Sequence, residues 1–357
     1  MKILKLKLVI FLLLSLLQAC GGGEVRKKSS SLQELKESAL QGDQEAQKKL
    51  IHILATNENS DTRATAARYI GEAKVKSANT QLQESFDIDD DHVRQYVIFA
   101  MGQVQIESNI EILLSTWKNT KEKKQIRYNA LRGLGYYSRA DAVKQLLSLL
   151  KTDDAEIYNI VIFALGNTGS KLAANPLIRE FKKGRNEQLC AFAIARIKEP
   201  GSFSDVVKIL DEKIYNNDFN NSFSPLADML IEANYAQAIE VFAKTYLVLG
   251  GNTYGVKGVI KTTVTRGLVK FKLKSTYGMV TASVLNLRNK PNTRSEITGK
   301  IPAGELAIVL SAGKVKHNID GKHDYWYKVK TEKGKTGWIF GGYLNLLRPE
   351  DLPPEKK

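Results

Sequence analysis

The residue types that most often perform chemistry are sparse in this chain, and their spacing builds no catalytic site. Cys190 lies beside Ala191 and Phe192 in an apolar helical pattern, where a buried structural thiol is expected rather than a nucleophile. No histidine accompanies it in an arrangement typical of cysteine enzymes. Neither a glycine-rich phosphate loop nor a serine nucleophile elbow is present. The sequence therefore predicts a protein that is not an enzyme and that uses no cofactor.

Two groups of polar residues have the composition of metal sites but not the spacing. Four aspartates fall within residues 87–91, yet a calcium loop starting at the first of them would need glycine where His92 stands. We interpret this cluster as an acidic turn in which Asp91 caps the following helix. His317 and His323 share one polar segment without a further ligand nearby, so no metal site is predicted.

The first residues have the pattern of an export signal. Lys2, Lys5 and Lys7 precede an apolar run from Leu8 to Leu17, which is the order of charge and apolarity typical of such signals. The run is shorter than the ~20 residues that a membrane-spanning helix needs. These features alone leave open an ordinary signal peptide or a signal that remains as an anchor.

The run ends in Leu17-Gln18-Ala19-Cys20, which resembles the lipobox of bacterial lipoproteins. The resemblance implies removal of residues 1–19, thioether lipidation of Cys20 and acylation of the new amino terminus, with palmitate among the acyl chains. Several acyl chains anchor a protein stably, whereas one does not. The glycines, lysines and serines of residues 20–31 predict a flexible tether. We expect a lipid-anchored protein of the cell envelope that faces the periplasm or the exterior, and Gly21 favours the outer membrane over the inner.

The chain carries a formal net charge of +15. An exported protein does not meet nucleic acid, so anionic lipid head groups and acidic wall polymers are the expected partners of this charge. Cys20 and Cys190 are the only cysteines, so lipidation of the first leaves no intramolecular disulfide.

The middle of the chain repeats itself. Segments that align without gaps close on Gly71, Gly102, Gly135 and Gly166, at a spacing of 31–33 residues. This spacing is typical of helical repeats, and the apolar residues of each segment follow the helical period. One helix pair cannot bury its apolar stripe alone, so the copies must stack.

These small-residue helices, together with Asn175-Pro176-Leu177-Ile178, resemble short HEAT-like repeats. The resemblance implies an α-solenoid, predicted over residues 32–250, whose extended surface binds an unidentified protein partner. In the following segment 251–276, Val269, Phe271 and Leu273 alternate with lysines, which predicts either a linker or a basic β-segment.

Short alternating stretches separated by glycine, proline and asparagine turns predict an all-β module over residues 277–347. The motifs Leu285-Asn286-Leu287-Arg288, Trp326-Tyr327-Lys328-Val329, Gly337-Trp338 and Tyr343-Leu344 resemble the bacterial SH3 family in type and order. The resemblance implies a small barrel that binds peptidoglycan or another wall polymer. The stretch Ser311 to Asp324 is longer than usual in that family and would alter the rim of a ligand groove.

Aromatic and basic side chains of this module are the candidate ligand contacts, because aromatic rings with a polar tip make good contact surfaces. They are Arg288, Tyr325, Tyr327, Lys328, Trp338 and Tyr343. Trp326 and Trp338 are expected in the core or in strand packing as well. Residues 348–357 form a charged tail that contains proline.

These observations predict a multidomain α plus β protein, an α-solenoid followed by an SH3-like barrel. Its expected function is that of a non-enzymatic adaptor in the cell envelope, with the barrel on the wall and the solenoid on a protein partner. One alternative is a scaffold for proteins alone, whose barrel binds a peptide or packs on the solenoid. An enzyme that acts on the cell wall is the third and weakest hypothesis.

Overall fold

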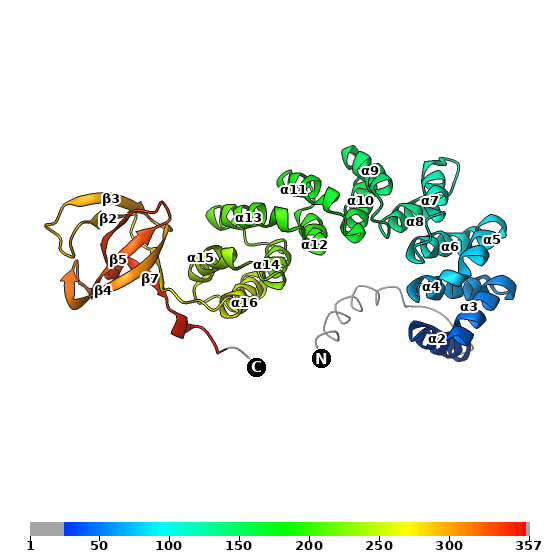
Figure 1. Cartoon of the computed structure of the whole chain (residues 1–357), viewed down its shortest axis with the longest axis horizontal. Helices are drawn as coiled ribbons and strands as arrows, with labels where there is room; N and C mark the ends of the chain where they lie inside the picture. Colours follow the sequence, from blue (N-terminus) through cyan, green and yellow to red (C-terminus); the bar gives the residue numbers. More distant parts are fainter. Residues whose placement is uncertain (1–24, 355–357) are drawn as a thin grey trace. The chain divides into compact units, whose positions relative to one another are not determined.

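The computed structural model describes residues 25–354, so the predicted export signal and Cys20 lie outside the described residues. Helices occupy the described chain from Val25 to Lys270, and strands form its C-terminal part (Figure 1). The predicted fold class, helical repeats followed by a small β domain, is confirmed. Within residues 25–354 no helix combines the length and the apolarity needed to cross a membrane.

The chain divides into two compact units, and the boundary falls between Tyr137 and Ser138. Helices α4, α6 and α8 of the first unit pack in sequence, α4 on α6 and α6 on α8, and α3, α5 and α7 pack against them. The helices of this unit are α2 (Val25–Leu40), α3 (Gln44–Thr56), α4 (Ser60–Glu72), α5 (Asn79–Ile88), α6 (Asp91–Gln103), α7 (Asn109–Lys118) and α8 (Lys124–Leu134). Helix α2 begins at Val25, within the segment 20–31 for which a flexible tether is predicted.

The recurring glycines lie where successive repeats approach most closely. A methyl group on Gly102 of α6 would lie 2.3 Å from the Cα of Gly133 in α8, and one on Gly71 would lie 2.9 Å from the Cα of Ala100. The α8 residue in this contact is Gly133, whereas the aligned Gly135 is the C-cap of the helix. Only glycine permits this backbone approach, which accounts for the spacing of the motif.

Polar side chains before α3, α4 and α6 accept hydrogen bonds from free backbone N–H groups of the first turn. Asp90, rather than the predicted Asp91, caps α6 and accepts a hydrogen bond from the N–H of Val93 at 3.0 Å. Asp91 is the first residue of the helix, where its charge still complements the helix dipole. The acidic cluster is therefore a cap and a first turn, one residue earlier than predicted.

The second unit has the same pattern of paired helices. Its helices α10, α12, α14 and α16 pack in sequence, and α15 packs on α16. The helices are α9 (Ala140–Ser148), α10 (Ala155–Thr168), α11 (Ala174–Lys182), α12 (Glu187–Ile197), α13 (Phe203–Tyr215), α14 (Phe223–Glu232), α15 (Ile239–Leu249) and α16 (Gly255–Lys270).

Helix α16 corrects the prediction of a linker or basic β-segment for residues 251–276, and it extends the array beyond residue 250. The alternation of apolar residues and lysines is typical of a strand, but packing overrides it. Phe271, just past the helix, stacks on Phe242 of α15 with ring centroids 5.9 Å apart. Gly267 lies directly against the same ring, 2.5 Å from where its Cβ would be. Contact with α15 thus fixes the segment as a helix.

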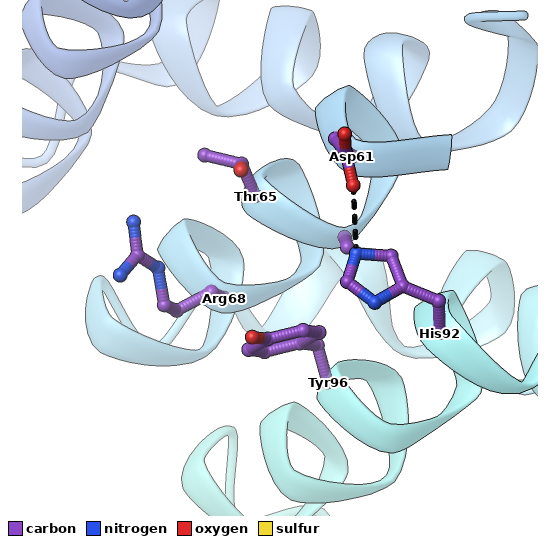
Figure 2. Close-up of a pocket in the computed structure, with 6 residues that line it drawn as sticks. Asp61, Thr65, Arg68, His92 and Tyr96 are labelled. Atoms are coloured by element: carbon purple, nitrogen blue, oxygen red, sulfur yellow. Dashed lines mark ion pairs between the residues drawn. The ribbon is translucent and has the colours of Figure 1, made fainter. Parts of the chain in front are cut away.

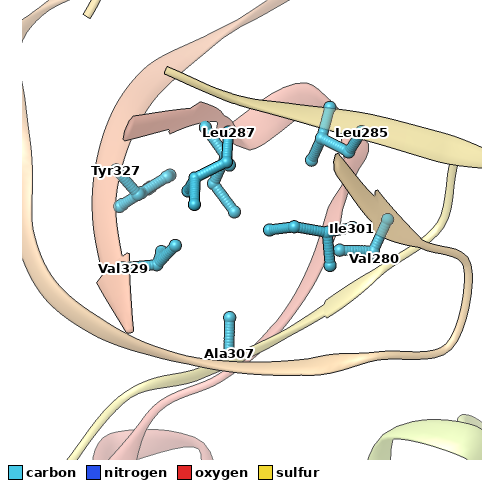
Figure 3. Packing of buried hydrophobic residues seen from close by; sticks show 8 residues of the cluster. Val280, Leu285, Leu287, Ile301, Ala307, Tyr327 and Val329 are labelled. Carbon is cyan, nitrogen blue, oxygen red and sulfur yellow. The ribbon is translucent and has the colours of Figure 1, made fainter. Parts of the chain in front are cut away.

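The barrel, residues 277–347, is one curled antiparallel sheet in the strand order β3-β2-β6-β5-β4-β1-β7. The strands are β1 (Tyr277–Val280), β2 (Val284–Arg288), β3 (Ile297–Pro302), β4 (Leu306–Ile319), β5 (Lys322–Thr331), β6 (Thr336–Phe340) and β7 (Leu344–Leu347). Alternate residues of these strands point to a common interior, as Figure 3 shows for Leu287, Tyr327 and Val329. The core of the barrel therefore occupies one face of every strand.

The long stretch from Ser311 to Asp324 is not a loop at the rim but an extension of the β4–β5 hairpin. Asp320 and Gly321 form its turn, and both have the positive φ that a two-residue hairpin turn requires. Strands β1 and β7 contact α15 of the same unit. The Nζ atom of Lys244 in α15 lies 3.4 Å from Oε1 of Glu332, beyond the end of β5.

Candidate functional site

The structure brings three of the predicted ligand residues together on the outer face of the barrel. Trp338 of β6 is the direct cross-strand partner of Arg288 in β2 on one side and of Lys328 in β5 on the other. Ile297 of β3 pairs with Arg288 and extends the line. Direct partners on antiparallel strands share a face, with side chains about 5 Å apart. We call Ile297, Arg288, Trp338 and Lys328 the outer row.

The strand alternation explains why these side chains point outward. Leu287 precedes Arg288, Val329 follows Lys328 and Ile339 follows Trp338, and all three of these neighbours lie in the barrel core. Gly337 stands before Trp338 because Leu287 fills the space of a side chain, 2.6 Å from where a Cβ would be. The Gly-Trp pair thus holds β6 close to β2 and sets Trp338 beside Arg288.

The outer row is accessible. Lys328 and Ile297 are exposed, while Arg288 and Trp338 are half-buried. The Nη1 atom of Arg288 donates a hydrogen bond to the carbonyl oxygen of Ser295 at 2.6 Å, so the guanidinium is held in place. An indole ring between two cations can stack on an apolar ligand face while the cations bind an adjoining anion.

The other predicted ligand residues do not join the outer row. Tyr327 is 8% exposed and belongs to the barrel core, and Tyr325 packs at the edge of the same core. Burial raises the pKa of Tyr327. The alternation with Val329 could have shown this, because Tyr325, Tyr327 and Val329 share one face of β5. Tyr327 is therefore a structural residue.

The tip of the β4–β5 hairpin contacts Tyr343. Its hydroxyl donates a hydrogen bond to Oδ2 of Asp320 at 2.7 Å, and the Nζ atom of Lys322 lies 4.0 Å from its ring centroid. The hydrogen bond to Asp320 raises the pKa of Tyr343. Sequence patterns did not place Asp320 and Lys322 at this ring, because the hairpin extension read as a loop. The hydroxyl and the ring of Tyr343 are therefore already in contact with Asp320 and Lys322.

The first unit contains a shallow polar pocket between α4 and α6, with a cavity volume of about 240 Å³ (Figure 2). Asp61, Ala64, Thr65, Arg68, His92 and Tyr96 line it. The Nε2 atom of His92 lies 3.0 Å from Oδ1 of Asp61, so two of its polar groups already pair with each other. The pocket is small and open, and its paired groups indicate contact between neighbouring repeats.

Cys190 is fully buried in α12, as predicted. Burial raises the pKa of its thiol to about 11, and its sulfur lies 3.9 Å from the hydroxyl oxygen of Tyr158. A protonated, inaccessible thiol is a poor nucleophile. The arrangement is that of a packed core residue.

Comparisons with known proteins agree with the domain content. Residues 110–194 match the family model of HEAT repeats, and residues 283–345 match that of the bacterial SH3 domain. No curated protein matches the chain.

Several solved structures resemble part of the chain. The complex of CpcE and CpcF of phycocyanin lyase from Nostoc sp. PCC7120 is 20% identical, with 64% of this chain and 88% of that chain covered and a TM-score of 0.38. An engineered protein solved by the Northeast Structural Genomics Consortium is 18% identical, with 63% and 68% covered and a TM-score of 0.40. The family matches support HEAT repeats in the helical part and a bacterial SH3 domain in the C-terminal part.

Proposed function

We propose that this protein is a non-enzymatic adaptor of the bacterial cell envelope. Its barrel binds peptidoglycan or another wall polymer, its solenoid binds a protein partner, and lipid on Cys20 anchors it in the membrane. The observation that carries the proposal is the outer row, an aromatic ring between two cations on a bacterial SH3 domain. Its chemistry suits an anionic polysaccharide of the wall.

The order of the modules supports a multivalent attachment. A lipid anchor and a wall contact on one chain raise each other's effective concentration, so a weak barrel affinity suffices. The barrel follows the solenoid, so the array lies between the two attachment points in sequence.

The solenoid offers a surface for a protein partner. Phe163 of α10 and Phe192 of α12 are 42% and 47% exposed, and they lie on two helices that pack together. The guanidinium of Arg196 lies over the ring of Phe163, 5.6 Å from its centroid. Exposed aromatic and arginine side chains are enriched at protein interfaces, which supports the partner-binding role.

Fractionation of cells that express variants of the full chain tests the proposal. Cys20→Ser should leave the protein associated with sacculi, and the double variant Arg288→Gln with Lys328→Gln should leave it in the membrane fraction. The triple variant, which combines Cys20→Ser with Arg288→Gln and Lys328→Gln, should appear in the soluble fraction. Lys314→Gln with Lys333→Gln, which removes the same charge from exposed positions, is the matched control. Retention of the triple variant in either insoluble fraction would refute double attachment.

One observation favours the alternative of a scaffold for proteins alone. The barrel packs on the solenoid through β1, β7 and the ion pair of Lys244 with Glu332. In that case the barrel would be a cap that completes the array. The fractionation separates the two functions, because a cap predicts that Cys20→Ser alone releases the protein.

A further inference from the structure

The outer row has the dimensions of a site for one sugar ring and an adjoining acid. Neighbouring strands lie about 4.8 Å apart, so the backbones that carry Arg288 and Lys328 are about 10 Å from each other with Trp338 midway. A single sugar ring fits on the indole between them. Groups attached to that ring would then reach one or both cations.

Arg288 is set up to accept a bidentate anion. Its Nη1 atom donates to the carbonyl oxygen of Ser295 at 2.6 Å, which holds the side chain on the face of the sheet. Among the described residues no acidic group pairs with it. A guanidinium fixed on one side and free on the other loses little conformational entropy when it binds a carboxylate.

Cations outnumber acids on the strands that carry this face, where β5 holds the single acid, Asp324. Strands β2, β3 and β6 have no aspartate or glutamate, and β3 and β5 add Lys300 and Lys330. Three further acidic residues of the barrel already accept hydrogen bonds. Asp320 accepts from Tyr343, Glu296 from Asn289, and Glu332 from the N–H of Leu306. The face therefore presents a positive field to a polymer.

Ile297 makes the outer row partly apolar at its far end. Its side chain is 46% exposed, beside Arg288 on the edge strand β3. A short apolar group of a ligand, such as the methyl of an alanine or a lactyl ether, would contact it. A polyanion without apolar groups would make no apolar contact with Ile297 or Trp338.

We infer that the outer row binds peptidoglycan at the junction of sugar and peptide, a deepening that rests on the proposed wall-binding function. The sugar stacks on Trp338, a carboxylate of the stem peptide binds Arg288 and Lys328, and the apolar groups of the stem contact Ile297. The site thus recognises a sugar together with a carboxylate of the peptide attached to it, and the ligand class is a carboxylate-bearing glycopeptide rather than a phosphate polymer.

The test is co-sedimentation of the mature chain, with Cys20→Ser, with three preparations of sacculi. The first is untreated, the second is stripped of phosphate polymers by hydrofluoric acid, and the third has its carboxylates converted to amides. Untreated and stripped sacculi should bind equally, and amidated sacculi at least tenfold more weakly. Loss of binding on stripping would overturn the carboxylate assignment in favour of phosphate.

Variants locate the site. Trp338→Ala, and Arg288→Gln with Lys328→Gln, should each weaken binding to untreated sacculi at least tenfold, whereas Trp338→Phe should retain most of it. Lys314→Gln with Lys333→Gln should change it less than threefold. Lys328→Gln alone changes an exposed side chain and keeps the test informative if another variant fails to fold. Unchanged binding by the outer-row variants would overturn the site but leave wall binding intact. Absence of any wild-type binding would overturn the proposed function.

Discussion

Arg288 on β2 and Trp338 on β6 are direct cross-strand partners, although 50 positions separate them in the sequence. Leu287 and Gly337, the residues just before them, pack together in the barrel core and so fix the pair. Gly337 faces the core, and by letting Leu287 pack closely it helps to position Arg288 beside Trp338 on the outer face. Packing inside the barrel and the outer row are therefore set by the same pair of strands.

The glycines of the repeats should resist even the smallest substitution. Gly102→Ala places a methyl group 2.3 Å from the backbone of Gly133, so α6 and α8 must separate. We expect a loss of about 2 kcal/mol in the free energy of unfolding, measured by urea denaturation. Gly251→Ala, in a turn with no atom within 4 Å, is the control and should change it by less than about 0.5 kcal/mol. Equal effects of the two variants would contradict the close contact.

An ion pair between repeats makes the stability of the first unit depend on pH. Arg94 Nη2 lies 2.6 Å from Oε2 of Glu122. Burial acts to raise the pKa of Glu122, but hydrogen bonds from Arg94 and from the N–H of Lys123 outweigh it and hold the pKa below 4.5. The unfolded state therefore binds the proton more readily, and this contribution to stability is present above pH 4.5 and is lost as the pH falls through the lowered value.

Glu122→Gln should remove the loss of stability that protonation of Glu122 causes in acid. It should also lower the free energy of unfolding by about 1–2 kcal/mol at pH 7. Urea denaturation between pH 3 and pH 7 measures both effects. Glu34→Gln, at an exposed position of α2, should leave the pH profile as in the wild type. A profile of Glu122→Gln parallel to that of the wild type would exclude the pair as its source.

The contact of the barrel with α15 should depend on Glu332. Glu332→Gln weakens the ion pair with Lys244 but keeps an oxygen that accepts from the N–H of Leu306. A partly exposed pair contributes about 0.5–1 kcal/mol, so the undocked population should rise two- to fivefold. Limited chymotrypsin digestion should then cleave faster after Phe271, and Glu350→Gln serves as the control. Unchanged cleavage would show that apolar contacts alone hold the barrel on α15.

The repeats could be predicted because their signal is periodic. The spacing of Gly71, Gly102 and Gly166 reflects a contact between neighbouring copies, so local sequence carried the information. The β-segment that was one prediction near Val269 is wrong, because packing against a distant residue decides the structure there. Phe242 stacks on Phe271. Tertiary packing here outweighed the local pattern.

The outer row could be predicted only in part. The motifs identified Arg288, Lys328 and Trp338 as candidates, but their adjacency depends on strand register, which no single motif encodes. Tyr343 was predicted with them because the sequence did not show its contact with the hairpin tip. Asp320 reaches Tyr343 only through the long extension of β4 and β5. Ile297 carried no signal, since one exposed isoleucine on a short strand is ordinary.

The most direct test of wall binding is co-sedimentation of the mature chain with purified sacculi at low salt and at ~0.3 M salt, where the Debye length falls to about 6 Å. Binding by a shaped site with a stacked ring should persist at high salt and be lost in Trp338→Ala. Binding that disappears at ~0.3 M salt, or that Trp338→Ala retains in full, would reduce the barrel to a charged surface and contradict the account.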